Sequence, residues 1–396
     1  MFCNKNKTSP AITPSQYRGD VRAGVAAGTL ATVSVVDVSV FNWFPVPALT
    51  VYRRGECTSL GFAFAIMVSS MAALPETLRA DVQVVDLRRI SALDLAPVLA
   101  EEAQVWREAL HWDLAPSIAL IDRFVSMQSL NGFALVKGAH VIGYCYFVCE
   151  EHKGLIGDLY ILRAEHSPER MALLLEAALD TLWHEPGIRR AEAQLLMLGS
   201  QPLPRIPSAR SFRSFARVFF EIDANAVAQL PPRDIQAMAT ISAWRETHQQ
   251  ASGWLLAAAY RGHIDSEIND QYRSPGGARR FLTNIVQYPG CGSFFAPASF
   301  AVFERASNAL CGMALASLVA PNTGHITQLC VAPSHKGTGV GYEMLRRSLQ
   351  ALVANGCETV GLTVTSANLE AIRLYQRMGF LRKREFSAWV WERRPA

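Results

Sequence analysis

The stretch SHKGTGVGYEMLRRSL, residues 334–349, places three glycines within five positions, directly before an amphipathic segment. Leu345, Leu349 and Leu352 recur at helical spacing, which predicts a long helix with one apolar face. Gly356 then supplies a residue that tolerates positive φ at a helix end. A glycine loop between a strand and a helix start predicts an anion site, because unpaired N–H groups and the helix dipole point at the ligand.

Two familiar phosphate-binding loops do not fit this stretch. A P-loop requires Lys-Ser or Lys-Thr at the helix start, whereas Gly341 is followed by Tyr342. A dinucleotide fingerprint requires an acidic residue about 20 positions further on, where this chain has Val360 and Gly361. Lys336 adds a positive charge, so the loop is suited to a phosphate-bearing ligand of another kind.

Two motifs around the loop carry a family resemblance. Val331-Ala332-Pro333 ends the preceding strand, and Lys336, Gly339 and Gly341 stand at the key places of the loop. A second segment, SANLEAIRLYQRMGF, has its matching residues at Asn368, Ala371, Leu374, Tyr375, Gly379 and Phe380. In order and spacing these motifs resemble the GNAT superfamily of acetyl-CoA-dependent acyltransferases, in which Gln or Arg is commoner than Lys at the first loop place. The resemblance covers about residues 230–396, with a weaker echo over 80–225.

The resemblance implies acetyl-CoA as the co-substrate, held by the loop and by the strand before it. Backbone amides of 336–341 would bind its pyrophosphate, and the strand at 329–331 would pair with the pantetheine amides. The coenzyme-binding residues expected on this basis are Leu329, Cys330, Val331, Lys336, Gly337, Thr338, Gly339, Val340, Gly341, Asn368 and Tyr375.

Two of these residues have implied roles in catalysis. Tyr375 would protonate the departing thiolate, and Asn368 would orient the acceptor or the coenzyme arm. A phenol with an ordinary pKa near 10 is protonated at neutral pH, which suits a proton donor independently of the resemblance. A helix N-cap at Asn368 and an amphipathic, half-buried Tyr375 are the alternatives that the residues alone leave open.

The base that takes the proton from an attacking amine is less evident. Many members of the superfamily place a Glu on the strand before the glycine loop, but this chain has Gln328 there. His325 is the nearest titratable group, and its ordinary pKa near 6.5 suits a general base, so we expect it to be catalytic. A histidine at the surface or in a turn is the competing interpretation.

The acidic segment GHIDSEINDQYRSP, residues 262–275, is the other place where the base could lie, with candidates His263, Asp265, Glu267 and Asp270. In the superfamily that it resembles, this region is expected to roof the acceptor site. Asp265 and Asn269 stand four residues apart, which predicts that they share a helix face. With Gln328 they are the expected substrate contacts, and acidic side chains favour a cationic acceptor such as an amine. A solvated helix end explains the cluster equally well.

The same order of elements occurs twice in the chain. Stretches beginning at residues 132 and 299 each read strand, turn, strand, turn, strand, loop, long helix, glycine stop, strand. A repeat of about 170 residues indicates two copies of a domain rather than a solenoid. The corresponding residues are Gly143 and Gly312, Leu159 and Leu329, and Ile161 and Val331.

These observations predict an α/β fold (α+β, mixed sheet) made of two tandem GNAT-like domains. Each would hold a central mixed, mostly antiparallel sheet flanked by helices, in residues 79–225 and 226–396. The first copy lacks a glycine between Gly157 and Gly187, and Glu165 and Glu169 would repel a phosphate. We therefore expect a degenerate first domain that shapes the cleft of a catalytic second domain, a tandem organisation similar to that of mycothiol synthase-like acetyltransferases.

Composition narrows the class of protein further. The chain of 396 residues has a formal charge of +4 with no basic run, which argues against a nucleic-acid partner. Its eight cysteines form no CxxC pair and no zinc-type spacing, so we expect no metal and a cytoplasmic location. Cys291, between two glycines, is expected in a tight turn. Residues 1–78 are expected to be a poorly ordered extension or to precede the true start, and the apolar run 60–74 is too short to span a membrane.

The sequence thus predicts an N-acetyltransferase that transfers an acetyl group from acetyl-CoA to a primary amine by direct attack. Its expected partners are acetyl-CoA and an amine acceptor, a small molecule or a peptide, without nucleic acid or membrane. An acetyl-CoA-binding regulatory module without turnover is one alternative, favoured by the missing strand Glu. Transfer of another acyl group is a second alternative.

Overall fold

The computed structural model of the protein describes residues 81–200, 203, 211–288, 290 and 292–393. The extension predicted for residues 1–78 and the turn predicted at Cys291 lie outside these residues. Among the residues described, no helix has both the length and the apolar character needed to cross a bilayer.

The first half of the described chain begins with a short strand and two helices. Its elements are β1 (Gln83–Asp86), η2 (Leu87–Arg89), α3 (Ala92–Leu110), α4 (Ala115–Ser126), β2 (Gly132–Lys137), β3 (His140–Glu150), β4 (Lys153–Ile161), η3 (Arg163–Glu165), α5 (Pro168–His184), β5 (Arg190–Gln194), η4 (Leu196–Leu198) and β6 (Phe212–Asp223).

The second half repeats this order with a longer helical region at its start. Its elements are α6 (Ala224–Ala228), β7 (Ala239–Ala243), η5 (Glu246–His248), α7 (Gln249–Ala259), α8 (Asp265–Ile268), η6 (Asp270–Arg273), α9 (Pro275–Gln287), β8 (Ser293–Phe294), η7 (Ala296–Ala298), β9 (Phe300–Glu304), β10 (Leu310–Ala320), β11 (Thr323–Val331), η8 (Pro333–His335), α10 (Val340–Ala354), β12 (Thr359–Thr365), α11 (Leu369–Arg377) and β13 (Leu381–Glu392).

Strand register confirms the internal repeat at the level of single residues. Gly143 of β3 lies opposite Ile161 of β4, and Gly312 of β10 lies opposite Val331 of β11. Both hairpins carry a β-bulge at the same place, with Gly157 as the extra residue of β4 and Thr327 as the extra residue of β11. Bulges re-aim the strand that carries them, so both copies bend their central hairpin where a ligand site would be built.

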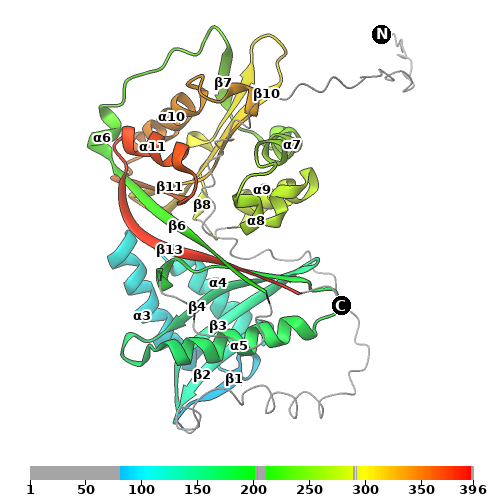
Figure 1. Ribbon diagram of the computed structural model, residues 1–396. Helices are drawn as coiled ribbons and strands as arrows, with labels where there is room; N and C mark the ends of the chain where they lie inside the picture. Colours follow the sequence, from blue (N-terminus) through cyan, green and yellow to red (C-terminus); the bar gives the residue numbers. More distant parts are fainter. Residues whose placement is uncertain (1–80, 201–202, 204–210, 289, 291, 394–396) are drawn as a thin grey trace, which may run out of the picture. The chain divides into compact units, whose positions relative to one another are not determined.

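The two halves share one continuous sheet, which sequence analysis did not anticipate. Its strand order is β1-β2-β3-β4-β5-β13-β6-β12-β11-β10-β9-β7, with β8 beside β10. The last strand of the chain, β13, pairs with β5 of the first half, while β6 pairs with β12 of the second. Figure 1 shows β6 and β13 running side by side as long strands, and their antiparallel pairing joins the halves. Each half therefore completes its sheet with the final strand of the other half. The domain boundary at residue 225 stays a prediction from the sequence.

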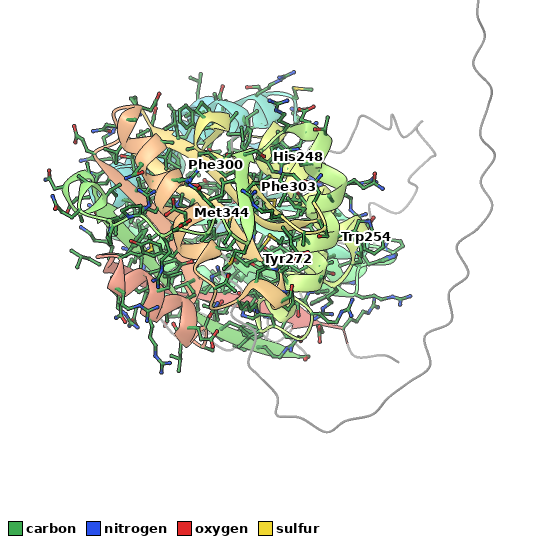
Figure 2. The ribbon with its side chains drawn as sticks, turned by 90° about the horizontal axis from the view of Figure 1, so that it is seen from above. His248, Trp254, Tyr272, Phe300, Phe303 and Met344 are labelled. Atoms are coloured by element: carbon green, nitrogen blue, oxygen red, sulfur yellow. The ribbon has the colours of Figure 1, made fainter. Side chains whose placement is uncertain are left out.

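Helices cover both faces of the second half of the sheet. On one face, the predicted stripe Leu345, Leu349 and Leu352 of α10 is fully buried in a cluster with residues of β11 and β12. Burying a side chain of this size stabilises a fold by about 1.5–3 kcal/mol. On the other face, Tyr260 and Tyr272 from the α7–α9 region pack against β10 and β11. Figure 2 labels Met344 of α10 and Tyr272 of η6, one from each helical layer.

Candidate active site

Strands β11 and β12 pair over three residues only and then diverge. The parallel ladder joins Thr323–His325 to Thr359–Gly361, and no strand of the described chain continues along that edge of β11. At the bulge, the hydroxyl of Thr327 donates to the carbonyl oxygen of Leu315 at 3.0 Å. Along 326–331 the backbone of β11 therefore has no neighbouring strand of the described chain on one side, and the amides of an extended ligand can take that place. We call this divergence of β11 and β12 the opening.

The glycine loop brings a bare helix start to this opening. Gly339 is the N-cap of α10 with φ of +94°, a left-handed conformation that glycine adopts without steric cost. No side chain of the described residues caps the helix there. Gly337 also has positive φ, and a β-carbon there would meet no atom within 4 Å. Thr338 turns its hydroxyl back to the carbonyl of His335 at 2.6 Å, which leaves the first N–H groups of α10 for a ligand.

Cationic side chains surround the loop. Nζ of Lys336 is buried without a hydrogen-bond partner among the described residues, and this burial lowers its pKa to about 8. Arg233, from the segment between the halves, crosses the loop so closely that a β-carbon at Gly339 would lie 3.1 Å from its Cγ. Sequence analysis missed Arg233, because the path of a linker is not encoded in its local pattern.

One acidic residue stands in the first turn of α10, where it would oppose phosphate binding. Burial alone would raise the pKa of Glu343, but hydrogen bonds from Arg346, the backbone of Arg233 and Arg347 hold that pKa at about 2. The shortest of these contacts joins Arg346 Nη2 to Glu343 Oε1 at 2.7 Å. The carboxylate is thus neutralised by its own partners, and the loop keeps its attraction for anions.

The two residues of the second motif lie on α11. Asn368 is the N-cap, its Oδ1 accepting a hydrogen bond from the backbone N–H of Ala371 at 3.2 Å. Tyr375 is fully buried, with ring centroids 6.1 Å from Phe220 and 5.4 Å from Phe380. Capping of α11 by Asn368 and core packing of Tyr375 are therefore observed, and their roles in catalysis stay predictions.

His325 and Gln328 both lie on β11 and are fully buried. The imidazole of His325 stacks on Phe219, with planes 1° apart, and meets the edge of Trp112 at a centroid distance of 5.1 Å. Gln328 donates from Nε2 to the phenol oxygen of Tyr260 at 3.0 Å. His325 therefore sits in an aromatic enclosure, two walls of which come from the first half of the chain.

The prediction that Asp265 and Asn269 share a helix face is wrong. Helix α8 ends at Ile268, and Asn269 has an extended backbone with φ of −122° and ψ of 108°. Asp265 is fully buried and accepts a hydrogen bond from the hydroxyl of Thr365, at the end of β12. Asn269 instead accepts from Lys153 Nζ of the first half at 3.3 Å. The Asp265 carboxyl thus lies beside the end of β12, whereas the Asn269 side-chain amide lies at the junction with the first half.

Comparison with known proteins identifies this arrangement. The family model described as the acetyltransferase (GNAT) family matches residues 263–380, which include the diverging strands and the glycine loop. The region 263–380 thus resembles GNAT acetyltransferases. Among curated proteins, the chain is 37% identical over 59 residues to the N-alpha-acetyltransferase MAK3 of Arabidopsis thaliana, covering 15% of this chain and 31% of that protein. It is 33% identical over 89 residues to the mycothiol acetyltransferase of Saccharopolyspora erythraea, covering 22% of this chain and 29% of that one. The chain thus spans about a third of the length of these relatives.

Solved structures extend the likeness to both halves at the level of the fold. A tandem GNAT protein from the clavulanic acid biosynthesis pathway superposes with a TM-score of 0.54 at 14% identity, covering 80% of this chain and 100% of that one. A GCN5-related N-acetyltransferase from Sphaerobacter thermophilus gives a TM-score of 0.55 at 16% identity, covering 82% and 98%. The predicted tandem GNAT fold is confirmed.

A buried lysine of the first half holds the segment 269–271 of the second half. Lys153 of β4 contacts Asp270 at 2.7 Å across the junction and Glu192 of β5 at 3.2 Å within the first half. Burial opposes the charge on Lys153, but its carboxylate neighbours outweigh burial and raise its pKa. Gln271 donates to the carboxylate of Glu150 at 2.8 Å. The first half therefore anchors residues 269–271, partners that sequence analysis missed because they lie more than 75 positions apart.

The corresponding helix start of the first half, at α5, is built differently. The N-terminus of α5 is capped by Ser167, whose hydroxyl accepts from the N–H of Arg170 at 3.2 Å. Glu165 lies beside it, paired with Lys137 at 3.1 Å and with Arg170. A helix start that carries its own cap and an adjacent carboxylate does not attract phosphate, which agrees with the absence of a glycine loop there.

Proposed function

We propose that the protein is an acetyl-CoA-dependent N-acetyltransferase whose reaction takes place in the C-terminal GNAT domain. One observation carries the proposal: β11 and β12 diverge beside a helix that starts at a glycine without a side-chain cap, and the loop before that helix holds a lysine whose Nζ is buried without a hydrogen-bond partner among the described residues. A diphosphate next to Lys336 and α10 would supply the missing acceptors. The residues present therefore fit coenzyme A, and its thioester would supply the activated acetyl group.

Each predicted site residue has a role in this proposal. Backbone N–H groups of Gly337, Thr338, Gly339, Val340 and Gly341, with the ammonium of Lys336, would bind the pyrophosphate. The edge of β11 at Leu329, Cys330 and Val331 would bind the pantetheine amides and offer an N–H to the oxygen that becomes negative during attack. Tyr375 would give its proton to the departing thiolate. Asn368 would orient the coenzyme arm, His325 is the base expected from sequence, and Asp265, Asn269 and Gln328 would line the acceptor side.

The names of the relatives support an amine as the acceptor. The Arabidopsis protein is named as an N-alpha-acetyltransferase, a class that acts on amino groups. Acidic residues in the segment 265–270 favour a cationic substrate, which a primary amine is at neutral pH. A small molecule or a peptide amine is therefore our proposed acceptor. A cytoplasmic location belongs to the same proposal, and the cysteines of the described residues are free thiols.

An assay for released thiol tests this function. The full chain is incubated with acetyl-CoA and a panel that includes an aminoglycoside, a polyamine, amino acids and peptides with a free N-terminus. We expect free CoA to appear with at least one amine, and Tyr375→Phe to lower kcat while the affinity for CoA stays unchanged. Tight binding of CoA without release from any amine would instead favour a regulatory module, for which Gln328 in place of a strand Glu is the supporting feature. Propionyl- and succinyl-CoA in the same assay would reveal another acyl preference.

A further inference from the structure

A buried histidine–carboxylate pair lies beside the opening, in the loop that follows α7. Nδ1 of His263 is 3.1 Å from Oδ2 of Asp265, and both side chains are buried, with the His263 residue 8% exposed. The other carboxylate oxygen, Oδ1, accepts a hydrogen bond from Thr365. Sequence analysis placed His263 among several candidates for the base without choosing it.

The pair is positioned across the divergence of β11 and β12. On one side, His263 packs edge-on against Tyr260 at a centroid distance of 5.5 Å, and Tyr260 accepts a hydrogen bond from Gln328 of β11. On the other side, Asp265 accepts a hydrogen bond from the hydroxyl of Thr365 of β12. Gln328 and Thr365 lie three and four residues beyond the last paired residues, His325 and Gly361. The loop from 260 to 265 therefore bridges the two strands where they have separated.

The contacts of Nδ1 decide which ring nitrogen carries the proton. Nδ1 is also 3.2 Å from the backbone nitrogen of Asp265, an N–H that would require Nδ1 to be an acceptor. However, a bare Nδ1 facing a buried carboxylate oxygen at 3.1 Å would leave two lone pairs opposed and Oδ2 without a donor. A buried charge without a hydrogen bond is strongly unfavourable. The carboxylate therefore favours the proton on Nδ1, which leaves Nε2 as the basic nitrogen.

We propose that His263 is the general base of the acetyl transfer and that Asp265 is its positioning residue. This inference rests on the proposed function. The amine attacks in its neutral form, after losing one proton to solvent. As its nitrogen bonds to the acetyl carbon, the carbon–sulfur bond breaks and the second proton lost by the amine passes to Nε2 of His263. The thiolate takes the phenolic proton of Tyr375, and exchange of one proton with solvent resets both side chains. Asp265 fixes the imidazole tautomer and stabilises the imidazolium that forms.

His263 is better placed for this role than His325. The ring of His325 is held between Phe219 and Trp112, and its residue is fully buried in that aromatic cluster. The ring of His325 faces aromatic side chains on two sides, whereas an imidazolium at His263 would face a carboxylate at 3.1 Å. His325→Gln is therefore the variant to compare with His263→Gln in a kinetic test of which histidine is the base.

The tautomer can be read in the wild-type protein without turnover. In the full chain labelled with ¹⁵N-histidine, the His263 imidazole should show a protonated Nδ1 and an unprotonated Nε2 at neutral pH. Asp265→Asn should shift the population toward the Nε2-protonated tautomer. A wild-type imidazole protonated on Nε2 alone would overturn the inference, and this result does not depend on whether any variant folds.

Kinetic comparison then tests the role itself, using acetyl-CoA and an amine accepted from the panel above. We expect His263→Gln to lower kcat by about 100-fold or more, with the KM for acetyl-CoA and the Kd for CoA within about twofold of wild type. Asp265→Asn should lower kcat at least about tenfold. His140→Gln, at an exposed position of the first half, should match wild type. Full activity of a folded His263→Gln, or a larger loss in His325→Gln than in His263→Gln, would overturn the inference. If wild type neither binds CoA nor turns over, the proposed function itself fails, and the tautomer result still stands on its own.

Discussion

The affinity for CoA should depend on pH through Lys336. Burial lowers the pKa of this lysine to about 8, so in the free protein it is about 90% protonated at pH 7 and about 10% protonated at pH 9. A bound diphosphate would hold the ammonium charged and restore a pKa near the ordinary value of about 10.4. Binding at pH 9 must therefore take up about one proton that binding at pH 7 does not. The Kd of CoA should rise about tenfold between pH 7 and pH 9, which is about 1.4 kcal/mol.

Isothermal titration calorimetry of CoA into the full chain at pH 7, 8 and 9 measures this effect. The phosphate groups of CoA add little, because their second pKa values lie near 6 and they are ionised throughout this range. Titrations in two buffers with different ionisation enthalpies give the number of protons that the complex takes up when CoA binds. Lys336→Met should bind more weakly at pH 7 and lose the pH dependence, whereas Lys336→Arg should keep affinity at pH 9. A wild-type Kd that is constant from pH 7 to 9, or the same slope in Lys336→Met, would refute the reasoning.

Three further predictions concern the junction of the halves, a buried acid of the first half and a cation beside the glycine loop. Lys153→Met should destabilise the protein by about 1–3 kcal/mol in urea unfolding, because Asp270 loses its ion-pair partner and Glu192 keeps only Arg190, and an unchanged stability would contradict this. Burial and the neighbouring Asp158 carboxyl raise the pKa of Glu102 well above its ordinary value, so its contribution to stability is present below about pH 4 and is lost as pH rises. The Tm of Glu102→Gln should therefore rise relative to the Tm of wild type between pH 5 and pH 9. A constant difference between the two Tm values would contradict the raised pKa of Glu102. Arg233→Ala should weaken CoA binding about threefold at low salt and less at high salt, as expected for an exposed cation near a phosphate, and no change at low salt would remove Arg233 from the site.

The local features of the fold were predictable because their physics is local. The apolar stripe of α10 and the positive φ of Gly339 and Gly356 follow from spacing and from glycine itself. The repeat was also visible, because corresponding residues such as Gly143 and Gly312 keep their place in both hairpins. These features sufficed to locate the candidate site.

Strand exchange was not predictable from the same information. The pattern of buried residues in β6 and β13 records that one face or both are covered, but not which strand lies alongside. The consequence for the site is large, because Phe219 and Phe220 of β6 pack against His325 and Tyr375 of the second half.

Sequence analysis named polar residues expected to contact the acceptor, but it predicted their arrangement in space incorrectly. Helical spacing suggested one face for Asp265 and Asn269, but Asn269 leaves the helix and caps η6 through its side chain, a role that asparagine favours. His263 was visible in the sequence, yet its pairing with Asp265 depends on the turn between α7 and α8. Polar clusters of this kind are set by tertiary packing, which short-range patterns do not record.

Hydrogen–deuterium exchange with and without CoA tests the central claim most directly, because it reports which backbone amides receive the ligand. We predict slower exchange at residues 329–331 and 337–342 when CoA is bound, with no change at the corresponding first-half residues 159–161 and 167–172. Unchanged exchange at 329–342, or equal protection in both halves, would contradict a coenzyme site at the opening between β11 and β12.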